Sequence, residues 1–229
     1  MALDPGAAEV QSWLANALVG RALDDLTDSV KPDLARAEDL VRQALAASPR
    51  NPFAHNARGQ LLRAWGRFEE AIAEYETVIA LDRNFAGAYA NLGRSKLLAG
   101  SVEETIPLQE RAIRLSPRDP KIGNWYYRIG LVHLLQSRTD EAIIWLKKAR
   151  YAGPGLPYIH AHLASAYALN GDSRRAGAAL AEAQRLDPAG LYSSIARQKA
   201  SSPKPAPTVA ALYESTYYAG LRKAGMPEK

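Results

Sequence analysis

The sequence predicts an all-α fold built from repeated helix pairs. Gly59, Gly93, Gly130 and Ala164 are separated by 34, 37 and 34 residues, so small side chains recur at a nearly constant spacing. Each period also holds two stretches with apolar residues at helical spacing, divided by a polar turn. A period of this length with two helices indicates a stack of repeats in which each unit packs on its neighbours.

Three further columns repeat with the same spacing and share one three-residue insertion near Lys121. They are Ala71, Thr105, Ala142 and Ala176; Val78, Ala112, Ala149 and Ala183; and Arg83, Pro117, Pro154 and Pro188. Small side chains let paired helices approach closely, and a proline cannot continue the second helix. The columns define units at 52–85, 86–119, 123–156 and 157–190.

The last unit shows how its two helices begin and end. Its first helix, around Leu163, ends at the turn Asn170-Gly171-Asp172, and its second, around Leu180, ends before Pro188. The unit 86–119 departs from this pattern. Ser101 and Glu104 predict a capping box at the start of its second helix, and Pro107 predicts a kink within it, because proline lacks a backbone N–H.

The N-terminal part reads as a degenerate unit over 8–51, whose first helix, around Trp13, is about ten residues longer than usual for a repeat of this length. Counting back 34 residues places Ala37 and Pro49 in the repeat columns. Residues 1–7 read as the tail of a preceding repeat, because Ala2-Leu3-Asp4-Pro5 is similar to Arg185-Leu186-Asp187-Pro188. We therefore expect the chain to begin inside a longer array.

The C-terminal part, 191–229, lacks the period. A proline-rich linker over 201–207 precedes a predicted helix with one apolar face, formed by Val209, Leu212, Tyr213, Thr216, Tyr217 and Leu221. One interpretation is a capping helix that covers the open end of the last repeat. The alternative is a tail that enters the groove of the repeats or pairs with a second copy.

The columns, the turn and the terminal proline resemble the tetratricopeptide repeat (TPR) family over most of the chain. The resemblance implies a right-handed α-solenoid of helix-turn-helix repeats with a C-terminal capping helix. It also implies a non-catalytic protein-interaction scaffold without a cofactor, whose first helices line a concave groove for a protein or peptide. The lysine and asparagine carboxylate clamp of chaperone-binding members is not matched.

Four segments carry a narrower resemblance, namely 112–120, 133–138, 192–197 and 220–228. Together they are similar to the C-terminal repeat regions of bacterial class III adenylate/guanylate cyclases of the rhizobial type. This resemblance implies a regulatory region in signal transduction that binds a partner or its own cyclase domain, while the segment itself is not an enzyme. The alternative is a free-standing adaptor or assembly factor unrelated to cyclase activity.

Several chemistries are excluded by residue type and spacing. The chain has no cysteine, and nucleophile-elbow, phosphate-loop and helical zinc motifs are absent. His160 and His162 lie two residues apart, about 200° around a helix, so they cannot share a metal. The net charge of +5 comes from interleaved basic and acidic residues, which argues against a nucleic-acid partner. No apolar run is long enough for membrane insertion, and no export signal is present, so we expect a cytoplasmic location.

The candidate ligand surface is the concave face of the first helices. By alignment of the units, it consists of Asn56, Gln60, Arg63, Asn91, Arg94, Tyr127, Arg128, His162 and Ser165. Asparagine amides can hydrogen-bond a peptide backbone, and arginines can bind a carboxylate in a bidentate manner. The first ligand hypothesis is therefore an acidic peptide or a free C-terminus. The alternative is that the three arginines are ordinary solvated residues or pair with acidic neighbours.

Overall fold

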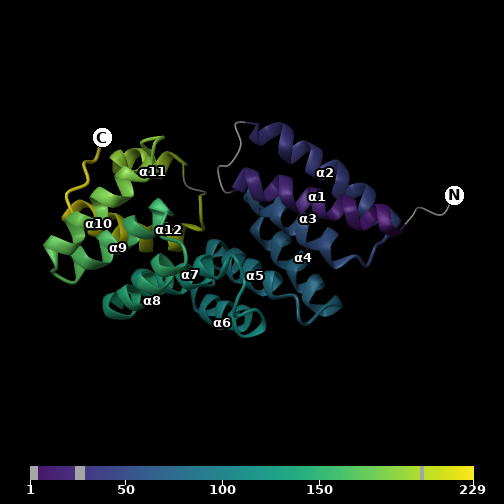
Figure 1. The fold of residues 1–229 in the computed structure, drawn as a ribbon, viewed down its shortest axis with the longest axis horizontal. Helices are drawn as coiled ribbons and strands as arrows, with labels where there is room; N and C mark the ends of the chain where they lie inside the picture. Colours follow the sequence, from purple (N-terminus) through teal and green to yellow (C-terminus); the bar gives the residue numbers. More distant parts are fainter. Residues whose placement is uncertain (1–4, 24–28, 202–203) are drawn as a thin grey trace. The chain divides into compact units, whose positions relative to one another are not determined.

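All regular structure in the part of the chain that the computed structural model describes, residues 5–23, 29–201 and 204–229, is helical (Figure 1). The predicted all-α helical repeat fold is confirmed. The helices form two compact units, residues 1–99 and 100–229, and each is described by itself.

The first unit is a stack of helices that pack on one another in chain order. Its helices are α1 (Pro5–Leu23), α2 (Val30–Ala47), α3 (Pro52–Ala64), α4 (Phe68–Leu81) and α5 (Ala86–Ala99). α1 packs on α2 and α3, α3 on α4, and α4 on α5. The core between α1, α2 and α3 contains Ala15, Val19, Ala37, Val41 and Leu61.

The second unit continues the pattern and ends in a segment without the repeat. It consists of a 3₁₀ helix (Val102–Glu104), α6 (Thr105–Leu115), α7 (Ile122–Leu135), α8 (Thr139–Ala152), α9 (Pro157–Leu169), α10 (Ser173–Arg185), a 3₁₀ helix (Leu191–Ser193), α11 (Ile195–Ser201), α12 (Pro207–Tyr213), a π-helix (Glu214–Tyr218) and α13 (Ala219–Lys223). α7 packs on α8, α8 on α9, and α9 on α10.

Two local predictions are wrong. Residues 5–7, assigned to the tail of a preceding repeat, form the first turn of α1, because the fixed φ of Pro5 suits the start of a helix as well as the residue after its end. Residues 1–4, the rest of that prediction, lie outside the described residues. The side chain of Ser101 makes no capping hydrogen bond, and a 3₁₀ turn precedes α6. Pro107 thus falls in the first turn of α6, where a missing N–H costs no helical bond.

The small-residue column lies where paired helices cross, as the spacing predicts. A Cβ atom on Gly59 would lie 2.7 Å from the ring of Tyr75 on α4. A Cβ atom on Gly130 would lie 2.8 Å from Cγ of Leu146 on α8. Glycine at these crossings therefore allows an approach that any side chain would prevent.

The turns within the pairs share one left-handed residue. Gly66 and Gly171 have φ of 74° and 83°, and Ser137 adopts φ of 60° at the corresponding position after α7. In each case the preceding helix ends and the next begins within three residues, so the chain reverses tightly.

Successive pairs are joined by a second repeated contact. In α3, α5 and α9 the side chain of the fourth helical residue contacts the carbonyl oxygen of the residue six positions earlier. Nε2 of His55 lies 2.9 Å from the Pro49 oxygen, and Nε2 of His160 lies 2.8 Å from the Pro154 oxygen. The hydroxyl of Tyr89 donates to the Arg83 oxygen at 3.2 Å. These contacts satisfy carbonyls in the loops between units.

Candidate functional site

The nine predicted ligand residues divide between the two units. Asn56, Gln60, Arg63, Asn91 and Arg94 belong to α3 and α5 of the first unit, and Tyr127, Arg128, His162 and Ser165 belong to α7 and α9 of the second. Within each unit the structure joins one pair of them by a hydrogen bond, Asn56 with Asn91 and Tyr127 with His162.

In the first unit the amides form a hydrogen-bonded row across α1, α3 and α5. Asn56 Nδ2 donates to Asn16 Oδ1 at 2.6 Å, and Gln60 Nε2 donates to the same oxygen at 2.9 Å. Asn91 Nδ2 donates to Asn56 Oδ1 at 3.2 Å. Asn16 is itself fixed, because its Nδ2 donates to the Phe53 carbonyl at 2.9 Å. We call Asn16, Asn56, Gln60 and Asn91 the amide ladder.

Arg63 lies beside the amide ladder on the same face of α3, three residues after Gln60 and seven after Asn56. Its side chain is only 6% exposed, and its Nε has no hydrogen-bond partner among the described residues. A buried guanidinium with an unsatisfied donor is costly. Arg94 is half-buried on α5 of the same unit.

In the second unit Arg128, His162 and Ser165 are buried, and Tyr127 is half-buried. Arg128 is buried, and its Nη1 lies 3.5 Å from Gln109 Oε1 on α6. His162 Nδ1 lies 2.7 Å from the Tyr158 carbonyl, which can only accept, so Nδ1 carries the proton. Nε2 then accepts from the Tyr127 hydroxyl at 3.2 Å.

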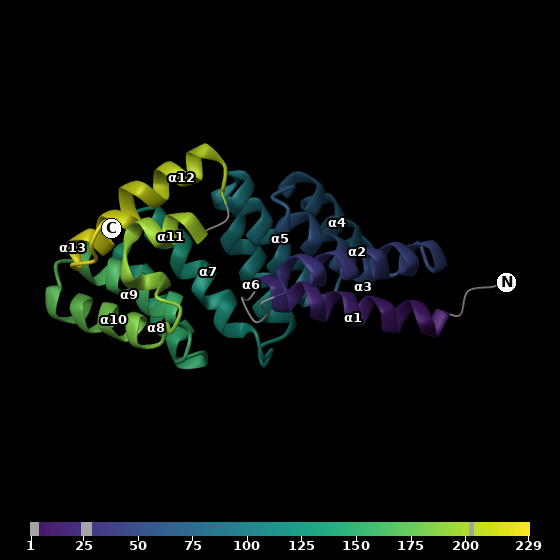
Figure 2. The same ribbon diagram turned by 90° about the horizontal axis from the view of Figure 1, so that it is seen from above.

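The C-terminal segment covers this face of the second unit. α13 packs on α9, and the π-helix packs on α7 and α9 (Figure 2). The ring of Tyr217 stacks on His162 with centroids 4.0 Å apart and 15° between planes. The backbone of Gly220 lies against Ser165, since a Cβ atom there would be 2.1 Å from Ser165 Oγ.

His162 and Ser165 were predicted to line an open groove. They are instead 4% and 0% exposed, because residues of the C-terminal segment cover them. The segment covers the last repeats, as a capping helix would. It does so on the side of their first helices, where a tail that enters the groove would lie. Peptide binding by the remaining residues stays a prediction. Sequence reasoning missed Asn16, because it lies 40 residues before Asn56 and therefore outside the 34-residue column.

Burial of His162 predicts a loss of stability in acid. Desolvation lowers its pKa from 6.5 to about 4, so the unfolded chain binds more protons between these values. The free energy of unfolding should therefore fall as pH decreases from about 6.5 to about 4. His162→Phe keeps a ring against Tyr217 but cannot be protonated. Urea unfolding at several pH values should show a smaller decrease for this variant, and equal pH dependence of both chains would contradict the assignment.

Neither a metal centre nor a bilayer-spanning helix is evident in residues 5–23, 29–201 and 204–229. No three acidic or histidine side chains gather there as metal ligands. No helix in the same ranges combines the length and the apolar character needed to span a membrane.

Two family models match the repeats, one described as TPR repeat over residues 59–100 and one as tetratricopeptide repeat over residues 118–157. The chain contains tetratricopeptide repeats. Such TPR arrays typically form non-enzymatic scaffolds for protein–protein interaction, which agrees with the predicted class of function. Neither match extends to the C-terminal segment.

Three solved structures share the fold. The thermophilic TPR protein TTC0263 of Thermus thermophilus has a TM-score of 0.61 and 22% identity, covering 92% of this chain and 99% of that one. The pilF protein of Pseudomonas aeruginosa has a TM-score of 0.64 and 18% identity, covering 93% and 96%. A crystal structure of MamA has a TM-score of 0.58 and 25% identity, covering 69% and 90%.

Curated relatives are much longer proteins. The BBSome complex member BBS4 of Bos taurus is 29% identical over 66% of this chain and 29% of its own length. The cell division cycle protein 27 homolog of Caenorhabditis elegans is 30% identical over 47% of this chain and 13% of its own. The chain thus spans less than a third of either relative.

Proposed function

We propose that the first unit of this TPR scaffold binds an acidic peptide segment along the amide ladder and Arg63. The observation that carries the proposal is the buried Arg63, whose Nε has no partner within the described ranges. A carboxylate of the peptide would accept from this guanidinium. The unit then gains more from an acidic ligand than from a neutral one.

The amide ladder supplies the contacts to the peptide backbone. The side-chain carbonyls of Gln60 and Asn91 accept no hydrogen bond from another residue of the described ranges, while their amide groups are engaged in the ladder. Each carbonyl can accept from a backbone N–H of an extended ligand. Because the ladder holds the two amides in a fixed orientation, little side-chain entropy is lost on binding.

The protein context has two candidate forms. In the first, suggested by the resemblance to class III cyclases, the array is a regulatory region that binds a partner or its own cyclase domain. In the second it is a free-standing adaptor or assembly factor unrelated to cyclase activity. An in-frame cyclase domain in the upstream gene sequence would decide for the first. We keep the cytoplasm as the proposed location in both.

Arg63→Met is the sharpest test, because methionine keeps an apolar side chain of similar length and removes the charge. We expect the affinity for acidic peptides, selected from a random peptide library on the wild-type chain, to fall at least about tenfold. The unfolding free energy should stay equal or rise, because an unsatisfied buried cation is removed. Fluorescence anisotropy and urea unfolding measure the two quantities.

Arg83→Met is the matched control, since Arg83 is exposed in the loop after α4 and loses the same charge. Its affinity for the selected peptides should remain within about twofold of wild type, because rim charges contribute little to affinity. Equal losses in both variants, or a marked destabilisation by Arg63→Met alone, would show that Arg63 is not a ligand residue.

A further inference from the structure

The outer face of α8 carries a stripe that the fold does not need. Ile144, Lys147, Lys148 and Tyr151 follow the spacing i, i+3, i+4, i+7 and therefore share one side of the helix. Ile144 is 54% exposed and Tyr151 is 92% exposed. The opposite side of α8 is fully buried, as Ala142, Leu146 and Ala149 show. We call the four exposed residues the α8 stripe.

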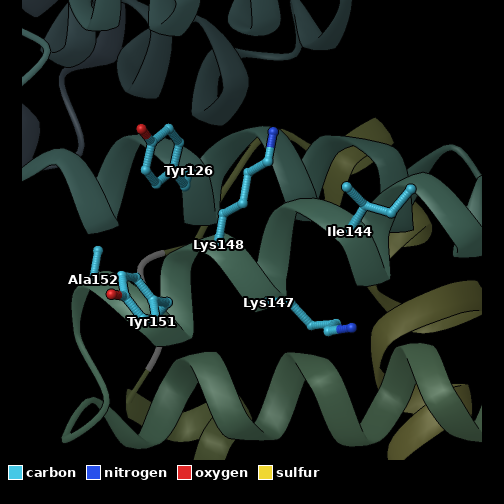
Figure 3. Close-up of a pocket in the computed structure, with 6 residues that line it drawn as sticks. All are labelled: Tyr126, Ile144, Lys147, Lys148, Tyr151 and Ala152. Carbon is cyan, nitrogen blue, oxygen red and sulfur yellow. The ribbon is translucent and has the colours of Figure 1, made fainter.

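The α8 stripe borders a hollow that Tyr126 of α7 and Ala152 complete (Figure 3). The hollow has a volume of about 590 Å³. The Tyr126 ring lies 5.8 Å from the ring of Trp145, and Lys148 Nζ lies 4.0 Å above the centre of that same ring. Two tyrosines and two lysines thus line the hollow, and one of these lysines lies over a neighbouring aromatic ring.

The positive charge of the α8 stripe is not neutralised within the described part of the chain. No ion pair there involves Lys147 or Lys148, whereas at each of the second helices α2, α4, α6 and α10 an arginine pairs with a carboxylate three or four positions away. Ile144 and Tyr151 flank this charge at either end of the stripe. An apolar–basic–basic–apolar order fits a surface of opposite charge with a bulky apolar side chain.

The second helices of the other repeats can be compared with α8 at the same four positions. The residues corresponding to the α8 stripe are Ala73, Glu76, Thr77 and Ala80 on α4, Pro107, Glu110, Arg111 and Arg114 on α6, and Ala178, Ala181, Glu182 and Arg185 on α10. None of these helices places large apolar residues at both ends of a basic pair. The repeat architecture therefore does not explain the stripe, and a contiguous exposed apolar and basic patch indicates an interaction site.

We propose that the α8 stripe is a second interaction surface, which binds an acidic segment of another protein. A bulky apolar side chain of that segment enters the hollow between Tyr126 and Tyr151, and flanking carboxylates pair with Lys147 and Lys148. A protein segment fits better than an anionic bilayer, because a hollow receives a protruding side chain whereas a bilayer presents a flat surface. The site lies on the second helix of its repeat and is separate from the amide ladder.

The test selects displayed 14-residue peptides on the full-length Arg63→Met chain, so that its result does not depend on the ligand proposed for the first unit. Enriched peptides are expected to carry Asp or Glu beside an aromatic or large aliphatic residue. Their affinity should fall at least about tenfold on K147E/K148E and also on I144S/Y151S, which keeps both charges. R111E/R114E, with the same change of charge on the equivalent face of α6, should bind within about twofold.

Three results would overturn the proposal. The first is the absence of any enriched peptide with this pattern. The second is an equal loss of affinity in K147E/K148E and R111E/R114E, which would indicate unspecific charge attraction. The third is stripe-dependent binding to phosphatidylserine–phosphatidylcholine vesicles without stripe-dependent binding of acidic peptides, which would assign the stripe to a membrane surface.

Discussion

Gly220→Ala is expected to detach the C-terminal segment from the second unit. A Cβ atom at this position would lie 2.1 Å from Ser165 Oγ and 2.6 Å from the Ser165 carbonyl oxygen. The carbonyl belongs to the backbone of α9 and cannot move without disturbing that helix. Overpacking of this kind costs about 1–3 kcal/mol, so the helix pair separates instead. Tyr217 would then lose its stacking on His162.

Hydrogen exchange followed by mass spectrometry checks this result. Amides in α12, the π-helix and α13 should exchange faster by at least about tenfold, the equivalent of about 1.4 kcal/mol, while α7 and α8 keep most of their protection. Gly177→Ala is the matched control, because nothing lies within 4 Å of its added Cβ atom on α10. That control should gain about 0.5–1 kcal/mol from helix propensity. Unchanged exchange in Gly220→Ala would show that α13 accommodates the methyl group in place.

Gly130→Ala is expected to destabilise the crossing of α7 and α8 by about 1–3 kcal/mol. The added Cβ atom would meet Leu146 Cγ at 2.8 Å and the Leu146 backbone nitrogen at 3.1 Å. Leu146 is fully buried, so its side chain has no open space to occupy. Ala164 holds the same column in the last unit, so the pair of α9 and α10 accepts alanine there.

A double-mutant cycle isolates this contact. Leu146→Ala alone leaves a cavity and destabilises the chain by about 2–5 kcal/mol. In that background Gly130→Ala should cost less than in wild type, because the atom it meets has been removed. Urea unfolding of the four chains gives the interaction energy. Additive effects of the two substitutions would mean that Gly130 acts through helix propensity or another neighbour.

The helix pairs could be predicted from the sequence because the same residue pattern recurs in each repeat. Each helix assigned in one repeat is therefore supported by the equivalent residues of the others. The first helices of the units begin at Pro52, Ala86, Ile122 and Pro157, within one residue of the starts that the columns predict. Small residues at helix crossings and glycines in turns are required by the local geometry of the backbone. Their positions in the sequence therefore locate the helix crossings and the chain reversals.

The candidate site could be predicted only in part. The alignment placed Asn56 and Asn91 on one face, but their partner Asn16 lies in the irregular first repeat, where no column applies. The apolar face of the C-terminal helix indicated that another surface must cover this helix. The sequence did not indicate which surface that is. The π-helix also adds a residue to one turn, so that Tyr218 and Gly220 join the buried face beyond the predicted residues.

The covering of α7 and α9 by the π-helix and α13 also has a consequence for the order of synthesis. The residues that cover this face emerge from the ribosome after the repeats they cover, and at about 5–20 residues per second the delay amounts to a few seconds. During that interval the aromatic face around Tyr127 and His162 is bare on the nascent chain. For a chaperone or a binding partner, this face is open to contact before α13 has been translated.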